Sequence, residues 1–537
     1  MARSIVLLSG SVASGKSTLA LRLQDRFGFA IVKTWQLLKN VKPEVEMERN
    51  SLQELGEELD RKTNGKWVVE ELDKVVRANP DGSYVIDAVR IRDQIDAIRH
   101  GFGSIVKHIH LEAPHETLVK RYKDRTDKPI KEFTSYEEVL KSKTEQAVPE
   151  LADAADIVVD TNRNTPDDVL IRAACHLGLL GRGYDRVVDV LIGGQYGSEG
   201  KGQVSAYLAP EYEVLVRVGG PNAGHSVFEE PKPYIFHSLP SGTRRAPKAQ
   251  IVIGAGAVVN IDTLWREIND CQLDHLRLSI DPQVMTISEE DIAAEKENVS
   301  SIGSTGQGVG AASARRITDR GGDSVKLARD IEKLRPYIRP AHDVIEEACR
   351  SQKRVFLEGT QGTALSLYHG YYPHVTSRDT TVAGCLAEAG ISPSRVRKVV
   401  MVCRTYPIRV QNPDGGPGKT SGPMSQEISL SEIERRSGIA LKQLEKTETT
   451  STTKRKRRIS EFDWTLLKKA AELNAPTDIA LTFVDYISVK NQQARRFEQL
   501  TSETLQFIQE VERVAEAPVS LIATRFHHRS IIDRRTW

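Results

Sequence analysis

A glycine-rich segment directly follows a short apolar run at two places in this 537-residue chain. The first is SIVLLSGSVASGKST at 4–18, and the second is VVDVLIGGQYGSEGKG at 187–202. A buried strand that leads through a glycine turn into a helix is typical of folds in which strands and helices alternate. Two such starts predict an α/β protein with two domains, each a mostly parallel sheet flanked by helices.

Further apolar runs place the boundary between these domains. Runs at 83–89, 104–112 and 155–161 continue the first pattern, and runs at 212–220, 250–259, 354–362, 398–406, 478–486 and 519–525 continue the second. Because domains usually hold about 100 to 200 residues, more than one is expected in a chain of this length. We expect a P-loop domain at 1–180, a linker at 181–186 and a second domain at 187–537.

Composition excludes several classes of protein. The formal net charge is only +2, so direct binding of nucleic acid is not expected. No stretch approaches the roughly 20 apolar residues that span a bilayer, so no membrane segment is expected. The five cysteines form no CxxC pair, which argues against disulfides and zinc and favours the cytoplasm. They are Cys175, Cys271, Cys349, Cys385 and Cys403.

The first glycine-rich segment, GSVASGKST, fits the phosphate-binding pattern G-x-x-x-x-G-K-[ST]. In such a loop the backbone N–H groups surround phosphate oxygens, the lysine adds positive charge, and the hydroxyl reaches Mg²⁺. A strand before the loop and a helix after it are the context that the pattern requires. The predicted nucleotide site therefore contains Gly10, Gly15, Lys16, Ser17 and Thr18, with Ser17 on the metal.

Three more residues are candidates for this first site. Asp87 ends an apolar run, where it would hold the metal or polarise an acceptor; its alternative is an ordinary turn acid. Arg121 and Arg125 resemble the lid arginines of nucleoside-monophosphate kinases and would neutralise a transferring phosphoryl group. Their alternative is a solvated helix face. The whole domain could also bind nucleotide only as a regulatory sensor.

The second half contains four polar, glycine-rich segments in a fixed order. They are GGQYGSEGKGQ (193–203), GGPNAGHS (219–226), GSTGQGVGAA (303–312) and EGTQGTALSLYHGYYPHVTSRDTT (358–381), followed by STTKRKRR (451–458) and LTFVD (481–485). In sequence and order they resemble adenylosuccinate synthetase, and they cover nearly all of residues 187–537. The spacing is most similar to the compact archaeal and phage members of that family.

The resemblance implies a two-step ligation. The γ-phosphate of GTP or ATP moves to the 6-oxygen of a purine nucleoside monophosphate, and the amine of L-aspartate then displaces it. This chemistry needs Mg²⁺, a base at purine N1 and a donor at the leaving phosphates. The resemblance implies His225 as that donor, Lys201 as a cation on phosphate, and Gln361 as the partner of the purine 6-substituent.

The remaining roles are also carried by the resemblance. The glycines would let the backbone approach phosphate, and the Gly224 carbonyl and Ser198 would lie at the metal. The nucleotide-binding residues would be Gly197, Gly200, Gly202, Asn222, Thr305, Thr376, Arg409, Asp485 and Arg320. The aspartate carboxylates would be recognised by Thr452, Thr453, Arg455 and Arg457; taken alone, KRKRR is equally typical of a solvated basic run.

One position departs from the family pattern in a way that bears on the substrate. The family loop reads G-D-E-G-K-G, and its aspartate serves as the base at N1 and as a metal ligand. Here the position is Ser198, a poor base and a weaker ligand. A serine leaves room for the 2-amino group of guanine and can accept its hydrogen bond, which is the feature of the phage branch that makes 2-aminoadenylosuccinate from (d)GMP.

Smaller departures concern the phosphate donor and the assembly. Phe483 stands where the family has a lysine two residues before Asp485, so ATP and GTP both remain candidate donors. The arginine that reaches the neighbouring active site in the family dimer would fall near Asp319, and Arg320 is the candidate beside it. If this arginine crosses, the active unit is a homodimer.

Three functions therefore remain open from sequence. The leading hypothesis is ligation of aspartate to (d)GMP, with a fused kinase-like activity that acts on a nucleotide. The second is ordinary adenylosuccinate synthesis from IMP. The third is a nucleotide sensor or effector without ligase turnover, which the loss of the aspartate favours and the retained His225, Lys201 and Gln361 oppose.

Overall fold

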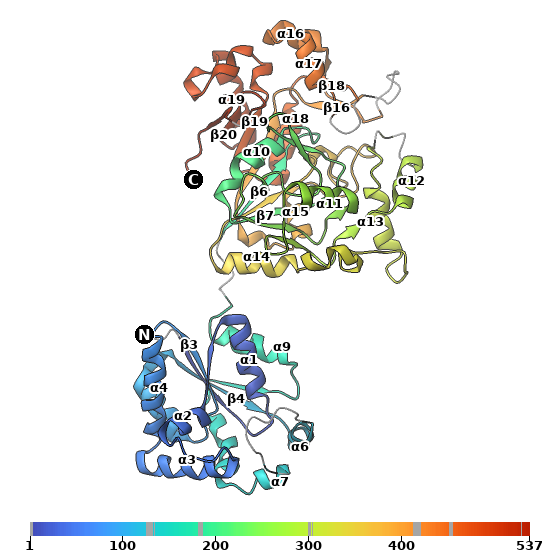
Figure 1. Ribbon diagram of the computed structural model, residues 1–537. Helices are drawn as coiled ribbons and strands as arrows, with labels where there is room; N and C mark the ends of the chain where they lie inside the picture. The colour runs from blue at the N-terminus through green and yellow to red at the C-terminus, as the bar shows by residue number, and fades with distance from the viewer. Residues whose placement is uncertain are drawn as a thin grey trace. The chain divides into compact units, whose positions relative to one another are not determined.

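The computed structural model describes residues 4–124, 133, 135–180, 186–298, 302, 304–411, 420–450, 455–527 and 529–537. The chain forms two compact units, residues 1–182 and 183–537, each with its own core (Figure 1). The boundary between them falls inside the segment 181–186 that the sequence analysis assigns to a linker. The division into exactly these functional domains stays a prediction.

The first unit is built on a five-stranded parallel sheet. Its order is β2-β3-β1-β4-β5, so the first strand lies in the middle with β3 on one side and β4 on the other. Loops that leave a parallel sheet at such a reversal of strand order form the usual ligand crevice. The strands are β1 (Ser4–Ser9), β2 (Ala30–Lys33), β3 (Ser83–Asp87), β4 (Val106–Glu112) and β5 (Ile157–Asp160).

Helices cover both faces of this sheet. Ile5 and Leu7 of β1 pack on one side under α2 to α5, and Val6 and Leu8 pack on the other under α1 and α9. The uninterrupted apolar run of β1 is thus explained by burial on both faces. The helices are α1 (Lys16–Phe27), α2 (Thr34–Val41), α3 (Arg49–Thr63), α4 (Lys66–Ala78), α5 (Arg92–Phe102), α6 (His115–Lys123), α7 (Tyr136–Val139), α8 (Lys143–Ala147) and α9 (Pro166–His176).

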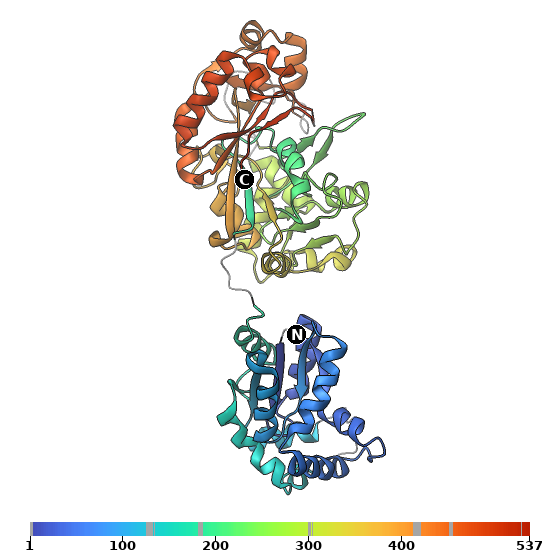
Figure 2. The same cartoon turned by 90° about the vertical axis from the view of Figure 1, so that its left-hand side faces the viewer.

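The second unit is built on a nine-stranded sheet that is parallel except for its last strand (Figure 2). Its order is β12-β10-β7-β14-β6-β15-β19-β20-β21, with β6 between β14 and β15. The glycine-rich loop after β6 therefore leaves from the middle of the sheet. The strands are β6 (Val188–Gly193), β7 (Val214–Arg217), β10 (Gln250–Ile253), β12 (Leu278–Ile280), β14 (Val355–Glu358), β15 (Val396–Arg404), β19 (Asp478–Thr482), β20 (Val519–Ala523) and β21 (Ile531–Asp533).

Two apolar clusters lie on opposite faces of this sheet. One includes α14, α15, α18 and α19, and the other includes α10 and α11. No helix in the described part of the chain is long and apolar enough to cross a membrane. The helices are α10 (Lys201–Leu208), α11 (Ile261–Asp270), α12 (Glu289–Asn298), α13 (Val309–Thr318), α14 (Ala341–Arg350), α15 (Val382–Ala389), α16 (Leu430–Ser437), α17 (Leu441–Thr447), α18 (Trp464–Asn474) and α19 (Ser502–Ala515).

Three small sheets carry parts of the polar segments. The hairpin of β8 (His225–Val227) and β9 (Tyr234–Phe236) starts at the histidine of the NAGHS segment. The other two pair β11 (Val258–Val259) with β13 (Met285–Thr286), and β18 (Arg457–Ser460) with β16 (Ile408–Val410) and β17 (Glu427–Ile428). The α/β class with two mostly parallel, helix-flanked sheets is thus confirmed.

Candidate functional site

The loop between β1 and α1 wraps around the amine of Lys16. Its Nζ donates to the carbonyl oxygens of Gly10 at 2.7 Å and Ser11 at 2.9 Å. Gly15 has φ of 100° and begins the helix, and a Cβ on Gly10 would lie 2.1 Å from the carbonyl oxygen of Leu111. Only glycine fits these two positions, so the backbone itself makes the cradle.

A cavity of about 480 Å³ opens on this loop. Ser17 and Thr18 line it, and the Ser17 hydroxyl donates to Asp87 Oδ2 at 2.8 Å, so a hydroxyl and a carboxylate oxygen of the kinds that bind Mg²⁺ lie together. Arg121 also lines the cavity and donates to the Thr161 hydroxyl and carbonyl, both at 2.9 Å. Arg125 lies outside the described residues.

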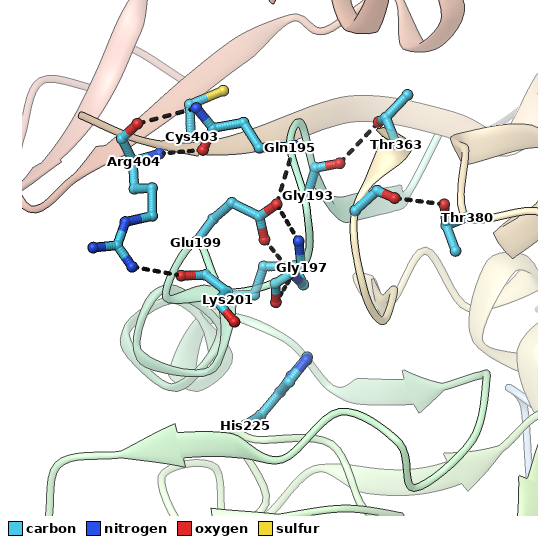
Figure 3. Close-up of polar contacts among 12 residues, drawn as sticks. Gly193, Gln195, Gly197, Glu199, Lys201, His225, Thr363, Thr380, Cys403 and Arg404 are labelled. Atoms are coloured by element: carbon cyan, nitrogen blue, oxygen red, sulfur yellow. Dashed lines mark hydrogen bonds and ion pairs between the residues drawn. The ribbon is translucent and has the colours of Figure 1, made fainter. Parts of the chain in front are cut away.

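In the second unit, the loop after β6 is organised by the buried carboxylate of Glu199 (Figure 3). Glu199 Oε1 accepts the N–H groups of Gln195 at 3.0 Å and Gly197 at 2.8 Å, and Oε2 accepts Lys201 Nζ at 2.7 Å. Lys201 Nζ also donates to the Gly197 carbonyl at 3.1 Å. The loop thus carries a fixed cation at its centre, with only 2% of Lys201 exposed.

The loop is also tied to the neighbouring strands. Gln195 Nε2 donates to the Arg404 carbonyl at 3.1 Å, and the Arg404 N–H donates back to Gln195 Oε1 at 2.9 Å. Gly197 and Gly200 have φ of 102° and 88°, where an L side chain would be strained. At Gly202, an added Cβ would lie 2.9 Å from the Cβ of His225, so this glycine lets α10 approach β8.

His225 belongs to a buried group of charges beneath this loop. Its Nδ1 lies in contact with Glu358 Oε1, and Glu358 also accepts Ser205 Oγ at 2.6 Å and the Ser241 N–H at 2.8 Å. Arg217 Nη1 pairs with the same Glu358 oxygen and lies 2.7 Å from His225 Nδ1. The Nε2 atom of His225 is buried without a hydrogen-bond partner among the described residues.

Burial and these charges set the ionisation of the group. Burial, followed by the Arg217 charge, lowers the pKa of His225 to about 3, so the imidazole is neutral at pH 7. Burial alone would raise the pKa of Glu358, but Arg217 and His225 lower it to about 2. An ionised carboxylate only accepts hydrogen bonds, so the proton on His225 lies on Nδ1, and Nε2 is left as the atom that takes a proton next.

A second cavity, of about 580 Å³, brings together predicted residues from six separate segments. Two pairs in its wall are already connected: the Thr305 hydroxyl donates to Asn222 Oδ1 at 2.9 Å, and Gln361 Nε2 donates to the Thr376 hydroxyl at 2.7 Å. The predicted residues that line the cavity are Gly197, Ser198, Asn222, Gly224, Thr305, Gln361, Thr376, Arg409 and Arg457.

Arg409 is engaged within the wall of this cavity. Its guanidinium donates to the carbonyls of His374 at 3.0 Å and Pro423 at 3.1 Å, and it lies 4.5 Å from the ring centre of Tyr196. Burial lowers the pKa of Arg409 to about 10, and it remains charged at pH 7. The side chain therefore stabilises the cavity wall as well as lining the cavity.

The predicted aspartate-binding segment is described only in part. Thr452 and Thr453 lie outside the described residues. Arg457 lines the cavity and donates to Glu448 Oε2 at 3.4 Å and to the Thr447 carbonyl at 3.2 Å. Arg455 is joined to Thr450 through its backbone, where its N–H donates to the Thr450 hydroxyl at 2.8 Å.

Asp485 and Arg320 lie apart from this cavity wall. Asp485 is 7% exposed, its Oδ2 accepts Gln492 Nε2 at 3.1 Å, and its Oδ1 is buried without a hydrogen-bond partner among the described residues. Burial raises the pKa of Asp485 to about 6. Arg320 is exposed after α13, whereas Arg315 is paired with Asp291 of its own chain.

Sequence reasoning missed five charged residues that hold the site. Glu199 and Glu358 lie inside the polar, glycine-rich segments, and Arg217, Arg404 and Glu448 lie outside them. Glu448 is 1% exposed and joins Arg404 Nη2 at 2.7 Å and the Tyr486 hydroxyl at 2.7 Å. The available signal was a charged residue at the end of a buried apolar strand, as with Arg217, Glu358 and Arg404.

Comparisons with known proteins agree with this geometry. The family model described as adenylosuccinate synthetase matches residues 190–330 and 323–493, and one described as an AAA domain matches residues 6–144. Adenylosuccinate synthetase from Methanococcus aeolicus is 34% identical over 354 residues, which is 64% of this chain and 99% of the relative. That from Thermococcus onnurineus is 35% identical over 356 residues, with 64% and 98% covered.

Two solved structures are each similar to about two thirds of the chain. One is the cyanophage S-2L succinoaminodeoxyadenylate synthetase bound to dGMP and dATP as an energy donor, with a TM-score of 0.55 and 27% identity over 66% of this chain and 96% of that one. The other, adenylosuccinate synthetase from Plasmodium falciparum, shares the fold, with a TM-score of 0.56 and 21% identity over 65% and 100%. The chain belongs to the adenylosuccinate synthetase family, and its N-terminal part carries a P-loop domain.

Proposed function

We propose that the second unit joins L-aspartate to position 6 of (d)GMP and forms 2-aminoadenylosuccinate. The observation that carries this proposal is Ser198, which replaces the acidic residue of the family loop while the rest of the loop is intact. Ser198 lines the 580 Å³ cavity beside Gly197, and no partner of its hydroxyl is recorded among the described residues. The hydroxyl is therefore available to accept a hydrogen bond from the 2-amino group of guanine.

The cyanophage structure supports this choice of substrate, because its protein is bound to dGMP and is 27% identical to this chain. The archaeal relatives, which are named adenylosuccinate synthetase, favour the alternative substrate IMP. Size alone gives little discrimination, since a cavity that accepts guanine also has room for hypoxanthine. A polar group matched to the extra amine discriminates far more strongly.

Every step of the ligation except removal of the N1 proton, for which Ser198 is a poor base, has a candidate residue in the cavity or beneath it. The terminal phosphoryl group of the donor moves to O6 of the purine, the bond to the leaving diphosphate breaks, and the aspartate amine then expels the phosphate. Lys201 would neutralise charge on the phosphates, and His225, whose Nε2 would take up a proton beside the phosphate charge, would then donate it to the leaving diphosphate. Gln361 would hold the purine 6-substituent, and Arg457 would bind a carboxylate of aspartate.

Mg²⁺ fits the oxygen atoms at the loop. Ser198 and Gly224 both line the cavity and offer a hydroxyl and a backbone carbonyl, which are hard ligands of the kind that Mg²⁺ prefers. The described residues contain no group of three or more His, Cys, Asp or Glu side chains that could hold a metal. Substrate phosphates would therefore supply most of the ligands, and the ion would stabilise negative charge on them.

The direct test is to supply purified protein with Mg²⁺, aspartate and either GTP or ATP, together with GMP, dGMP or IMP, and to identify products by mass spectrometry. We expect a succinylated guanine nucleotide that has lost its 6-oxygen. Product from IMP alone would overturn the substrate, and no product from any monophosphate would favour a nucleotide sensor.

Ser198→Asp should reverse the preference of the enzyme between GMP and IMP. The carboxylate would supply a base at N1 and crowd the 2-amino group, so the ratio of kcat/KM for GMP to that for IMP should fall by about 100-fold or more. Ser198→Ala is the matched control, because it removes the hydroxyl without adding a base and should not create activity on IMP. A ratio that does not change in Ser198→Asp would contradict the assignment.

For the phosphate donor we infer GTP, from the unpartnered oxygen of Asp485, whereas the cyanophage protein, which is bound to dATP as an energy donor, favours ATP. A carboxylate accepts hydrogen bonds only, and it matches the N1–H and 2-amino donors of guanine better than the mixed edge of adenine. Asp485→Asn should raise the KM for GTP about tenfold or more and leave the KM for GMP unchanged. Because the pKa of Asp485 is raised to about 6, GTP binding should also weaken as the pH falls below 6. Equal use of ATP and GTP by the parent protein would refute this inference.

The first unit is proposed to transfer a phosphoryl group from a bound nucleoside triphosphate. Its support is the Lys16 cradle together with the contact between Ser17 and Asp87, which places a hydroxyl and a carboxylate where a metal–phosphate complex would lie. We also propose a homodimer, in which the exposed Arg320 would reach the partner's cavity. Analytical ultracentrifugation of the full chain tests the second of these proposals.

A further inference from the structure

The cavity of the first unit extends on both sides of the P-loop. On one side it is lined by Arg121 and by residues after β5; on the other it is lined by residues from the ends of β2 and β3, of which the sequence analysis assigns only Asp87. The P-loop pattern accounts for a triphosphate at the loop itself. The side beyond Asp87 is therefore the place for an acceptor, and its residues are Lys33, Trp35, Asp87, Ala88 and Arg90.

Strand register brings this second side together. Asp87 is paired with Leu8 of β1 and with Lys33 of β2, so the carboxyl ends of three adjacent parallel strands meet at one point. Trp35 follows two residues later in the first turn of α2, and the Thr34 hydroxyl donates to the Ala88 carbonyl at 2.6 Å. The junction of β2 and α2 is thus fastened to the turn after β3.

This side of the cavity carries more positive charge than the binding of a triphosphate requires. Lys16 and Arg121 already stand at the P-loop, yet Lys33 lines the same cavity, and no ion pair or hydrogen bond of its amine is recorded among the described residues. Arg90 is held against the buried carboxylate of Glu145. A cation that faces a cavity with no protein partner indicates an anionic ligand.

Trp35 adds a flat apolar wall. It is half-buried, with part of its ring packed on the core under α2 to α5 and part facing the cavity. Aromatic faces stack with planar rings such as nucleobases. A small polyol would gain little from this surface.

Buried hydrogen bonds hold the Arg90 turn in place from behind. The Arg90 N–H donates to Gln94 Oε1 at 3.0 Å, and Gln94 Nε2 donates to Asp60 at 3.0 Å. Asp60 also accepts Trp67 Nε1 at 2.7 Å. This rigid support is typical of a built binding site.

We propose that Lys33, Trp35 and Arg90 form the acceptor subsite of the first unit, and that its acceptor is a nucleoside monophosphate. The proposal rests on the phosphotransfer function inferred above. Lys33 and Arg90 bind the acceptor phosphate, and Trp35 stacks on its base. An oxygen of that phosphate attacks the γ-phosphorus of ATP, the bond to the β,γ-bridging oxygen breaks, and the products are ADP and a nucleoside diphosphate. Both units then use the same class of nucleotide.

The experiment uses the full chain carrying His225→Asn, so that the ligase does not consume nucleotide, with Mg-ATP and no aspartate. GMP, dGMP, AMP, guanosine and gluconate are supplied in turn, and ADP and phosphorylated products are quantified by chromatography and mass spectrometry. We expect a nucleoside diphosphate from at least one monophosphate. Lys33→Ala and Trp35→Ala should each raise the KM for the acceptor at least tenfold while the KM for ATP stays within twofold.

Two matched variants make the outcome decisive. Lys39→Ala removes an exposed lysine from the same helix and should leave both KM values unchanged. Trp35→Phe keeps a stacking ring and should retain most of the acceptor affinity, which separates stacking from loss of folding; thermal unfolding checks each variant. Phosphorylation of guanosine or gluconate but of no monophosphate would overturn the acceptor class. Unchanged acceptor KM in Lys33→Ala and Trp35→Ala would overturn the subsite. If no phosphoryl group were transferred to any acceptor, the proposed phosphotransfer function itself would be contradicted.

Discussion

His225→Asn should lower kcat for the ligation by about 100- to 1,000-fold, with a much smaller change in the KM for either nucleotide. His225 Nε2 is a buried atom with no hydrogen-bond partner among the described residues, beneath the phosphate-binding loop. Once Nε2 has taken up a proton beside the phosphates, it is a preorganised donor to the leaving group; such a donor acts mainly in the transition state, and removing one costs roughly that factor. Asparagine retains a polar group of smaller size and limits the disturbance of packing. Steady-state kinetics with the preferred monophosphate give kcat and KM separately.

The matched control for this variant is His342→Asn, an exposed histidine on α14, which should leave kcat unchanged. If His225→Asn raised KM and left kcat intact, the residue would serve substrate binding alone. If kcat and KM were both unchanged, the assignment of His225 as the donor would be wrong.

The same histidine predicts a pH dependence of stability in the second unit. Because the folded pKa of His225 is near 3 and its ordinary value is 6.5, the unfolded state binds the proton more readily. The neutral imidazole therefore contributes fully to the free energy of unfolding above pH 6.5. This contribution is lost as the pH falls toward 3, and the free energy of unfolding then decreases by at most about 1.4 kcal/mol per pH unit. Between pH 7 and pH 4.5, the melting temperature should fall less steeply in His225→Asn than in the parent protein. Equal slopes would contradict the assignment.

The fold could be predicted from sequence because its central strands are continuous apolar runs. β1, β14 and β15 are buried on both faces, so their sequences contain little polar alternation and stand out from their surroundings. The edge strand β2 and the short β12 and β21 were not predicted. Each has only three or four residues, and strands of that length are specified by neighbours in the sheet more than by their own pattern.

The site was predictable where it depends on local backbone, and less so where it depends on distant partners. Gly10 and Gly197 could be predicted from the sequence, because these loops need backbone conformations that only glycine adopts without strain. Glu358 and His225 are 133 positions apart, and Glu448 lies 44 positions from Arg404. No spacing rule connects such residues, so the supporting carboxylates emerge only when the strands are placed side by side.

Glu358→Ala should lower the free energy of unfolding of the second unit by about 3–5 kcal/mol. The carboxylate is fully buried and accepts hydrogen bonds from His225, Ser205 and Ser241 as well as Arg217. Its loss would leave the guanidinium of Arg217, which is 2% exposed, charged in the interior without its counter-ion. Breaking a buried ion pair from one side costs this much because the remaining charge stays desolvated.

Denaturant unfolding resolves this effect, since the first unit has a separate core and supplies an internal reference. Glu347→Ala, which removes an exposed carboxylate paired with Arg350, should change stability by less than about 0.5 kcal/mol. Glu358→Gln keeps the shape and one acceptor oxygen but removes the charge and the second acceptor, so it should cost less stability than alanine. It should still lower kcat, because an uncharged amide no longer holds the Nδ1 proton of His225 as firmly. A loss below about 1 kcal/mol in Glu358→Ala would mean that Arg217 finds water or another partner, and that the carboxylate serves the orientation of His225 alone.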